Sequence, residues 1–546
     1  MSTGRAAAIA GAVGRGHPRG PGRGLVLGLA LALLVVAAAC RGTAGQGPAG
    51  YLRVAIANGP TNLDPRIGID EASQRVHQLV FSPLFRLDER LDVVANVATG
   101  FTMPDDHTYL VTLRPDVRFH DGRLLTSADV VFTFRSFLDP AFVSGRKGAY
   151  RMVQAVDAVD AQTVRFTLKE PFASFPINLV MGIVPAGAKD IASHPIGSGP
   201  YVFERLLPDD RVELGRFDRY FEGPAANPGV VLAVVPDDTM RGLELRKGTI
   251  DLVLNDLSPD IVTDLEARGE VRVTRSPGCD YAYVGLNLRD PLLRDVRLRR
   301  ALAHAVDRRA IVEYLRRGLA VESKGILPPS QWAYEPSTPD FAYDPARAKA
   351  LLDEAGYRDP DGDGPRSRLH LVLKTSNAEF VRLQATVIQQ DLKRVGVDVE
   401  VRSYEFATFL SDVIKGNFQM CTLQWVGVAD PDMLRRVYHS AQVPPAGWNR
   451  GFFTDPEVDA LIERASRTPD RATQKALYSE AQRRIADAVP SISLWHKTNV
   501  IIAQPNIRPG VLTPIADLSF LRTTRRVAPT DRSTPPPTAA RPPAAP

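Results

Sequence analysis

Aromatic and amide side chains recur on one face of a predicted strand, and groups of this kind can hold a ligand. Residues 281–288 read YAYVGLNL, so Tyr281, Tyr283 and Asn287 share one face because successive strand residues point to opposite faces. The other face is apolar from Ala282 to Leu288. Rings and polar groups beside a glycine are typical of the wall of a ligand cleft. A strand with one solvated face produces the same alternation, so both interpretations stay open.

Residues that could support catalysis occur only as isolated pairs. His120 and Asp121 stand together before a glycine, but no nucleophile or metal-ligand spacing accompanies them, and we interpret them as part of a turn. The sequence contains no HExxH, G-x-S-x-G or Walker pattern and no cluster of cysteine and histidine. We therefore expect no enzymatic activity, no catalytic residue, no metal and no cofactor.

One acidic loop resembles half of a calcium site. Residues 359–364 read DPDGDG, with acids at loop positions 1, 3 and 5 and a glycine at 6. Position 12 is His370 rather than the glutamate that completes such a loop. A solvated turn is the better interpretation, and calcium binding stays open.

Helical periodicity begins soon after the strand that carries the two tyrosines. Apolar residues recur at helix spacing between Val296 and Val306, Asp307 can cap a further turn, and Gly318 ends it. The arginines in this segment are interrupted by acids and no base-reading motif accompanies them, so a solvated helix face is favoured and nucleic-acid binding is not expected.

Length, charge and the N-terminus define the class of protein. A chain of 546 residues is too long for one core and predicts at least two domains. The formal charge is +5, but the first 39 residues hold four arginines and no acid, so the rest is nearly neutral. The arginines precede an apolar run from Leu25 to Val36 that is typical of a signal peptide. Cys40 follows three alanines and is a candidate lipidation site, with ordinary signal cleavage or an uncleaved anchor as the alternatives.

Two cysteines remain after Cys40. Cys279 and Cys421 could form a disulfide in an oxidising compartment or stay as two separate buried thiols. The sequence does not decide between these states.

Several motifs occur in an order that resembles one family. Residues 119–134 read FHDGRLLTSADVVFTF, 197–201 read GSGPY, 295–308 read DVRLRRALAHAVDR and 343–357 read YDPARAKALLDEAGY. These stretches, from about Tyr51 to Leu521, resemble the family 5 extracytoplasmic solute-binding proteins, the peptide- and nickel-binding subunits of ABC importers. The order of the motifs is more specific than any one of them.

The resemblance implies an α/β fold with two lobes joined by a hinge, in the large form with three subdomains. The expected first lobe is discontinuous (51–83, 198–288 and 496–523), with 84–197 as a subdomain inserted in it. The second lobe is expected at 289–495. Before these come the signal peptide (1–39) and a lipidated tether (40–50), and after them a proline- and alanine-rich tail (524–546) expected to be disordered.

The resemblance also implies a ligand loop. Residues 425–432 read WVGVADPD and resemble that loop, which places Trp425 beside the cleft. In the peptide-binding relatives an aspartate three residues after the tryptophan holds the amino terminus of the peptide. That position is Val428 here, and the next acid is Asp430. Arg382 lies near the place where some dipeptide binders bind a carboxylate, although a surface helix arginine is as plausible.

The expected function is that of a receptor that closes two lobes on a peptide-like or other small solute and delivers it to a permease. The expected partners are separate permease and ATPase chains, the solute, and a membrane surface through the lipid anchor; the protein is expected to be a monomer of the periplasm or cell envelope. An extracytoplasmic hydrolase and a signalling or adhesion receptor on the same fold remain the alternatives.

Overall fold

The structure, a computed structural model, describes residues 47–528 except 363 and 446. The chain forms two compact units, Met1–Ala49 and Gly50–Pro546, and only three residues of the first are described. The predicted signal peptide, Cys40 and the tail from residue 529 lie outside the described residues, so the predictions made for them stay predictions.

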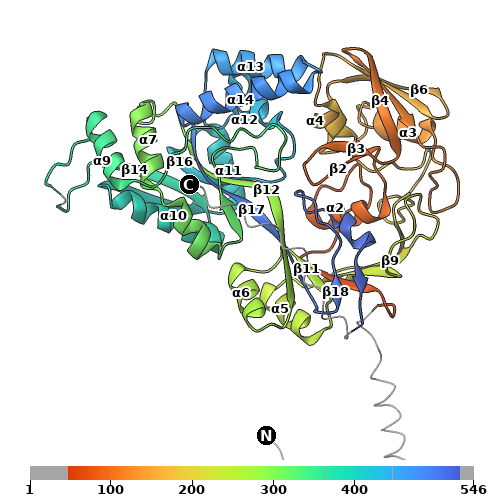
Figure 1. The fold of residues 1–546 in the computed structure, drawn as a ribbon. Helices are drawn as coiled ribbons and strands as arrows, with labels where there is room; N and C mark the ends of the chain where they lie inside the picture. The colour runs from red at the N-terminus through yellow and green to blue at the C-terminus, as the bar shows by residue number, and fades with distance from the viewer. Residues whose placement is uncertain (1–46, 363, 446, 529–546) are drawn as a thin grey trace, which may run out of the picture. The chain divides into compact units, whose positions relative to one another are not determined.

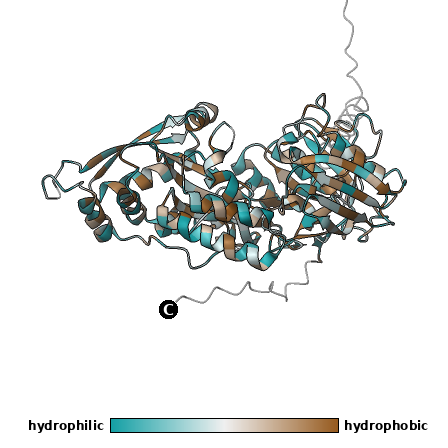
Figure 2. Cartoon of the chain, turned by 90° about the horizontal axis from the view of Figure 1, so that it is seen from above, coloured by the Kyte–Doolittle hydropathy of each residue, from teal (hydrophilic) through white to brown (hydrophobic). Residues whose placement is uncertain are grey.

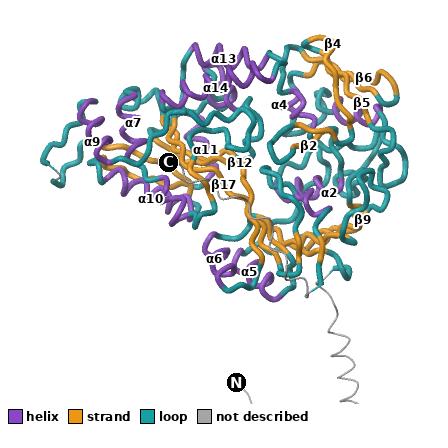
Figure 3. The backbone as a smooth tube through the Cα atoms, viewed as in Figure 1, coloured by secondary structure: helices purple, strands orange, loops and turns teal. Residues whose placement is uncertain are grey.

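One long mixed sheet runs through the second unit (Figures 1 and 3). It has eleven strands, and β13 (Ala320–Glu322) joins it by pairing with β17 beside the main order. The main order is β15 (Val397–Tyr404), β14 (Leu369–Ser376), β16 (Met420–Trp425), β12 (Arg272–Leu286), β17 (Ser491–Ala503), β11 (Leu252–Leu254), β1 (Leu52–Ile56), β10 (Gly229–Val234), β9 (Arg211–Arg216) and β8 (Tyr201–Leu207).

Strands β12 and β17 connect two groups of strands. They are the longest in the chain's described part, with 15 and 13 residues, and they pair with each other in antiparallel register. On one side β17 pairs with β11, and on the other β12 pairs with β16. We call the group β1 and β8–β11 with its helices the first lobe, and the group β14–β16 with its helices the second lobe. The two-lobed α/β fold predicted from the sequence is confirmed, and the residue boundaries of the lobes stay a prediction.

Helices cover both faces of the first lobe. On one face, α2 (Glu71–Val80) packs its apolar side on β1 and β10 together with residues near the C-terminus such as Leu518. On the other face lie α5 (Asp238–Lys247) and α6 (Pro259–Ala267). The parallel neighbours β1, β10 and β11 are buried on both sides and therefore read as nearly continuous apolar runs.

The GSGPY turn predicted from the sequence packs directly on the end of α2. A side chain at Gly197 would place its Cβ 1.9 Å from the Val80 carbonyl oxygen, and one at Gly199 would lie 2.5 Å from the Leu79 oxygen. Only glycine permits so close an approach of two backbone segments. His120 is hydrogen-bonded to this turn through Gly197 and Gly199, which agrees with its interpretation as a structural residue.

A separate four-stranded sheet lies between α2 and β8 in the sequence and has a core of its own. Its order is β4 (Ala98–Asp105), β5 (Thr108–Leu113), β7 (Thr163–Leu168) and β6 (Val153–Asp160). The helix α3 (Ser127–Arg135) packs on it and begins with a capping box between Thr126 and Asp129. The hairpin β2 (Phe85–Leu87) and β3 (Val93–Ala95) and the short α4 (Lys147–Tyr150) complete this inserted subdomain.

The second lobe has a helical layer on each face of its strands. One layer holds α7 (Val296–Ala305), α8 (Arg308–Ala310), α9 (Pro345–Glu354) and α10 (Glu379–Lys393). The other holds α12 (Met433–Tyr438), α13 (Pro456–Arg467) and α14 (Arg471–Ala488), while α11 (Phe406–Lys415) packs near Cys421. The predicted cap is present, since Asp307 caps α8, and Asp295 and Asp344 cap α7 and α9 in the same way.

Hydropathy colouring shows apolar residues alternating with polar ones along the helices and strands (Figure 2). Near the end of the described chain, β18 (Ile507–Arg508) pairs with β19 (Arg525–Arg526).

Cys279 and Cys421 are both buried and free, so they do not form a disulfide. Within residues 47–528, apart from the two gaps, no helix is both long and apolar enough to cross a membrane.

Candidate functional site

The structure brings Tyr281, Tyr283 and Trp425 together as a stack of rings. The centroids of Tyr281 and Tyr283 are 5.5 Å apart, those of Tyr283 and Trp425 are 6.3 Å apart, and the interplanar angle is 7° in both pairs. Trp448 extends the stack at 5.3 Å from Trp425, and the guanidinium of Arg450 lies 4.3 Å from the centroid of Trp425.

This stack is packed inside the second lobe. The three predicted residues are 1%, 7% and 8% exposed and contact α12, α13 and α14. The cavity beside them measures about 30 Å³, which is the volume of about one water molecule. Tyr281 shares a hydrogen bond of 2.7 Å with Ser493, and burial raises the pKa of Tyr283. The stack therefore forms part of the core around a very small space, and a direct contact with solute stays a prediction for these residues.

The other predicted residues lie in different surroundings. Asn287 donates hydrogen bonds to the carbonyl oxygens of Gly416 and Phe418, an arrangement that fixes the backbone before β16. Arg382 is exposed on α10. Asp430 is half-buried, and burial together with the neighbouring Asp432 raises its pKa to about 6. The structure does not gather these three with the aromatic stack into one site.

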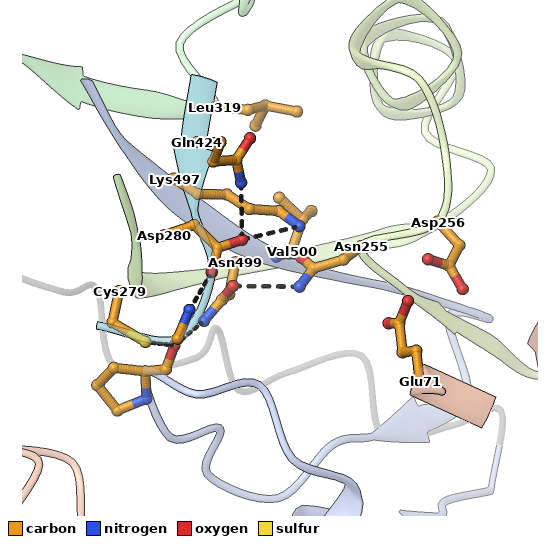
Figure 4. A network of polar contacts seen from close by, with 12 residues as sticks. Glu71, Asn255, Asp256, Cys279, Asp280, Leu319, Gln424, Lys497, Asn499 and Val500 are labelled. Atoms are coloured by element: carbon orange, nitrogen blue, oxygen red, sulfur yellow. Dashed lines mark hydrogen bonds and ion pairs between the residues drawn. The ribbon is translucent and has the colours of Figure 1, made fainter. Parts of the chain in front are cut away.

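A polar network occupies the point where β12 and β17 leave the second lobe (Figure 4). Asp280 accepts hydrogen bonds from Gln424 and from the backbone of Gly427, and Lys497 lies 3.9 Å from it. Next to it Asn499 links Asn255 of the first lobe to the backbone near the C-terminus. The network joins the ligand-loop segment to the two connecting strands. The signal that could have revealed it in the sequence is Asp280, an acid inside the strand β12.

A cavity of about 550 Å³ lies on the first-lobe side of the described chain. Small-molecule sites in proteins are commonly clefts of about 300–1,000 Å³. Its lining side chains come from α2, the β2–β3 hairpin, residues 180–182 and 220–222, and the segment 511–523. None of the described lining residues falls between 289 and 495.

The cavity nevertheless borders the predicted ligand loop. Leu87 and Ile515, which line the cavity, form one apolar cluster with Cys279 of β12 and Ala429 of the loop. The loop is tied to β12 by a hydrogen bond of 3.0 Å from the Val428 amide to the Cys279 carbonyl. Val428 itself is fully buried. The cavity, the loop and the connecting strand therefore meet at this cluster.

Three residues that line this cavity have a polar atom without a hydrogen-bond partner. His77 Nδ1, Asn96 Oδ1 and Arg146 Nε are each buried and have no hydrogen-bond partner in the described chain. His77 and Asn96 are 7% and 8% exposed, and Arg146 is half-buried. Buried polar groups are ordinarily satisfied because each one left unpaired costs about 1–3 kcal/mol. The three residues line the cavity, but these three atoms have almost no accessible surface, so a ligand in the cavity does not reach them unless the side chains move.

Charged groups at the far wall are already paired with one another. Glu222 lies 3.4 Å from both Arg86 and Arg522, and its carbonyl accepts a further hydrogen bond of 3.1 Å from Arg522. The Arg522 guanidinium also lies 5.8 Å from the ring centroid of Tyr220. The two arginines outnumber the one carboxylate, so this group of three side chains keeps a net positive charge. Sequence reasoning missed every residue of the cavity, since none of them lies in a chemical motif.

A metal site has little support. Asp105, Asp106 and His107 could offer three ligand atoms within 4.8 Å, but they sit on an exposed turn between β4 and β5. In the acidic loop at 359–364, Asp359 accepts hydrogen bonds from the backbone amides of Asp361 and Gly362, as in an ordinary turn, and residue 363 is outside the described chain. The cavity of about 550 Å³ remains the candidate solute site of the described chain.

Comparisons with known proteins agree with this assignment. A family model described as bacterial extracellular solute-binding proteins, family 5, middle region, matches residues 92–443. Glutathione-binding protein GsiB of Salmonella typhimurium is 30% identical, covering 86% of this chain and 93% of its own. Heme-binding protein A of Haemophilus influenzae is 28% identical over 85% of this chain and 90% of its own. The solved structure of the oligopeptide-binding protein AppA from Bacillus subtilis in complex with a nonapeptide is 25% identical, with a TM-score of 0.70 over 88% of this chain and 99% of AppA. The chain belongs to the family 5 extracellular solute-binding proteins of bacteria, as its motifs predicted.

Proposed function

We propose that this protein is the receptor subunit of an ABC importer, and that it captures a peptide-like solute and delivers it to separate permease and ATPase chains. The observation that carries the proposal is the cavity of about 550 Å³, whose wall combines apolar side chains such as Leu87 with polar ones such as Gln74. A pocket of this size, mostly preformed and with a few polar groups that orient the ligand, is typical of a small-molecule site.

The arrangement of the lobes supports a closing receptor. The inserted subdomain contacts the second lobe through a hydrogen bond of 2.8 Å from the Ala173 amide to the Ser466 carbonyl and through an ion pair between Asp92 and Arg471. Both contacts lie outside the connecting strands β12 and β17, and both can break if the lobes separate. Hinge closure on a ligand is a known motion of two-lobed binding proteins.

The relatives support the peptide-like class, because the printed names of GsiB and AppA refer to glutathione and to oligopeptides. We further propose that the mature chain begins at a lipidated Cys40, that it acts as a monomer in the periplasm or cell envelope, and that the lobes have the boundaries predicted from the sequence. Trp425, Tyr281, Tyr283, Asn287, Asp430 and Arg382 remain proposed ligand-site residues.

The proposal is tested by thermal unfolding of the purified mature protein with peptide, oligosaccharide and metal-chelate libraries. A ligand that binds only the native state raises the midpoint of unfolding by mass action. We expect peptides to give the shift. Gln74→Trp places a large ring at the cavity wall and should abolish the shift, whereas Gln154→Trp on the exposed face of β6 should preserve it. A shift with oligosaccharides or chelates alone would contradict a peptide receptor.

A further inference from the structure

Three consecutive residues of the inserted subdomain contact the second lobe. They are Phe172, Ala173 and Ser174, in the loop that follows β7, and we call them the contact segment. The Ala173 amide donates a hydrogen bond of 2.8 Å to the carbonyl oxygen of Ser466 in α13. The guanidinium of Arg435 on α12 lies 5.7 Å from the centroid of the Phe172 ring.

Ser174 adds a polar contact with the predicted ligand loop and with α14. Burial raises the pKa of Asp430 in the loop and of Tyr478 on α14, and the neighbouring Ser174 hydroxyl partly offsets both shifts. The segment is held on its own side by Tyr109, whose hydroxyl donates a hydrogen bond of 3.0 Å to the Phe172 carbonyl. The contact segment is therefore anchored in the inserted subdomain and contacts three helices and a loop of the second lobe.

The contact segment is close in sequence to the wall of the cavity of about 550 Å³. Residues 180–182, which follow it, line that cavity. The nearby ion pair between Asp92 and Arg471 also starts from a cavity segment, because Asp88 and Glu89 of the same hairpin are lining residues. Contacts that form when the lobes close are thus built on the chain segments that enclose the cavity.

Asp430 makes no ion pair within the described residues, although two arginines of α12 are close to it. Both arginines are paired with the buried Asp432, Arg435 at 2.7 Å and Arg436 at 2.9 Å. Asp430 accepts a hydrogen bond of 2.7 Å from the backbone amide of Asp432. Its charge is therefore only weakly compensated.

The other groups around Asp430 are uncharged. Residues 171–180 of the inserted subdomain hold no acid, lysine, arginine or histidine. Burial raises the pKa of Tyr478 well above its ordinary value and also raises that of Cys279 on β12, in the cluster with Ala429, so both stay neutral. Closure of the lobes therefore places a carboxyl group against an uncharged surface.

This environment favours the protonated form of the carboxyl group. Burial first, and then the charge of Asp432, raise the pKa of Asp430 to about 6, against smaller opposing effects of Ser174 and Arg436. Opening of the lobes removes the contact segment and lets water reach the carboxyl, so its pKa returns toward 3.8, the ordinary value for an aspartate.

We propose that residues 172–174 form a latch that holds the two lobes closed over the cavity, and that the Asp430 carboxylate takes up a proton from solvent when the latch closes and returns it when the latch opens. The inference rests on the proposed function and adds a regulation of the same site. Because the closed form binds the extra proton, acid favours closure and a rising pH favours opening. A full return to the ordinary pKa changes the ratio of closed to open molecules by about tenfold between pH 7.5 and pH 5.

The experiment measures the distance between the lobes in the purified mature protein without solute, by pulsed spin-label spectroscopy. The labels are attached at Gln154→Cys on β6 and Ala460→Cys on α13, both exposed positions, while Cys279 and Cys421 are buried. We expect the ratio of short to long distances to rise about 3- to 10-fold as the pH is lowered from 7.5 to 5.

Variants assign the response to the latch. Asp430→Asn should remove the pH dependence, whereas Asp398→Asn, at an exposed acid on β15, should preserve it. Ser174→Ala should favour the long distance at pH 7.5 and have less effect at pH 5, because its hydroxyl stabilises the charged carboxylate. The exposed Ser193→Ala is the matched control. If a thermal melt shows that Asp430→Asn does not fold, Asp430→Ala replaces it.

The outcomes separate this inference from the proposed function. A distance that does not change between pH 5 and pH 7.5, or a change that persists in Asp430→Asn, would overturn the proton coupling. A Ser174→Ala protein that behaves as Ser193→Ala does would overturn the latch. Because no solute is present, a failure of peptides to bind would overturn the peptide receptor without altering these distances.

Discussion

At the scale of single residues, Trp425 shows how a predicted contact residue can also be structural. It is 8% exposed, stacked between Tyr283 and Trp448, and its indole nitrogen has no hydrogen-bond partner in the described chain. Its neighbour Ala429 reaches the cluster that borders the large cavity. The buried Trp425 side chain thus packs in the core and holds the start of the loop in place.

Replacement of this side chain tests the structural role. We expect Trp425→Ala to lower the free energy of unfolding by about 3–5 kcal/mol, because removal of a buried ring leaves a cavity. Trp448→Ala, at a residue that is 41% exposed, is the control and should cost clearly less. Denaturant unfolding of both variants measures the difference, and equal losses would contradict the burial of Trp425.

Asp430 is a residue whose charge opposes folding at neutral pH. Its pKa is raised to about 6 from the ordinary value of 3.8 for an aspartate, so between these values the unfolded chain releases a proton that the folded chain keeps. Stability from this group is present at low pH and is lost as the pH rises from about 3.8 to about 6.

Replacement of the acid by its amide removes this penalty. We expect Asp430→Asn to raise the free energy of unfolding by about 1–2 kcal/mol at pH 8, after discounting for partial exposure, and to make no difference near pH 4. Denaturant melts at the two pH values provide the comparison. Asp398→Asn, at an exposed acid on β15, is the control.

At the scale of elements, the sequence predicted helix caps and turns well because they depend on local chemistry. Asp307 caps the helical turn predicted after it, and the GSGPY turn lies where its residues predicted it. The strand at 281–288 was also predicted, but its surroundings depend on two layers of helices, and the layer of α12–α14 lies more than a hundred residues away in the sequence. Tyr281 and Tyr283 face α12–α14, and the opposite face packs on α7 and α10. Alternation alone could not distinguish a second helical layer from a cleft.

The two faces of β12 can be compared directly. We expect Leu286→Ala, at a residue with 0% exposure, to cost about 2–5 kcal/mol of stability, and Tyr283→Ala to cost about as much or more. Both losses follow from burial between two layers. If Tyr283→Ala weakened solute binding while stability stayed unchanged, the tyrosine face would be a cleft wall after all. Denaturant melts and calorimetry on both variants distinguish these outcomes.

At the scale of the whole molecule, the motif order predicted the family and the fold, whereas the large cavity could not be predicted. Its lining residues include His77 on α2, Asn96 after β3, and Arg146 before α4, and its paired wall comes from Glu222 and Arg522. Each of these residues is ordinary in its own segment. These residues become neighbours only when distant segments pack together, and no local sequence pattern predicts that packing.

The last prediction concerns the stability of the whole second unit in acid. His77 in the first lobe and His496 on β17 are buried and His120 in the inserted subdomain is half-buried, and burial lowers the pKa of each to about 4. The folded chain keeps these rings neutral, while in the unfolded chain they take up protons below about pH 6.5. The contribution of these three neutral rings to the free energy of unfolding is therefore fully present above pH 6.5 and is lost progressively as the pH falls from about 6.5 to about 4.

The size of the effect follows from proton linkage. Each histidine contributes a slope of up to about 1.4 kcal/mol per pH unit, so three together give up to about 4 kcal/mol per pH unit before Asp430 offsets part of it. We expect the free energy of unfolding to fall steeply between pH 6 and pH 4.5. His120→Asn is expected to flatten this slope by about one third, whereas His107→Asn, on the exposed turn between β4 and β5, should leave it unchanged. Denaturant melts across this range measure the slope, and a chain that is equally stable at pH 7 and pH 4.5 would contradict the burial of neutral histidines in all three places.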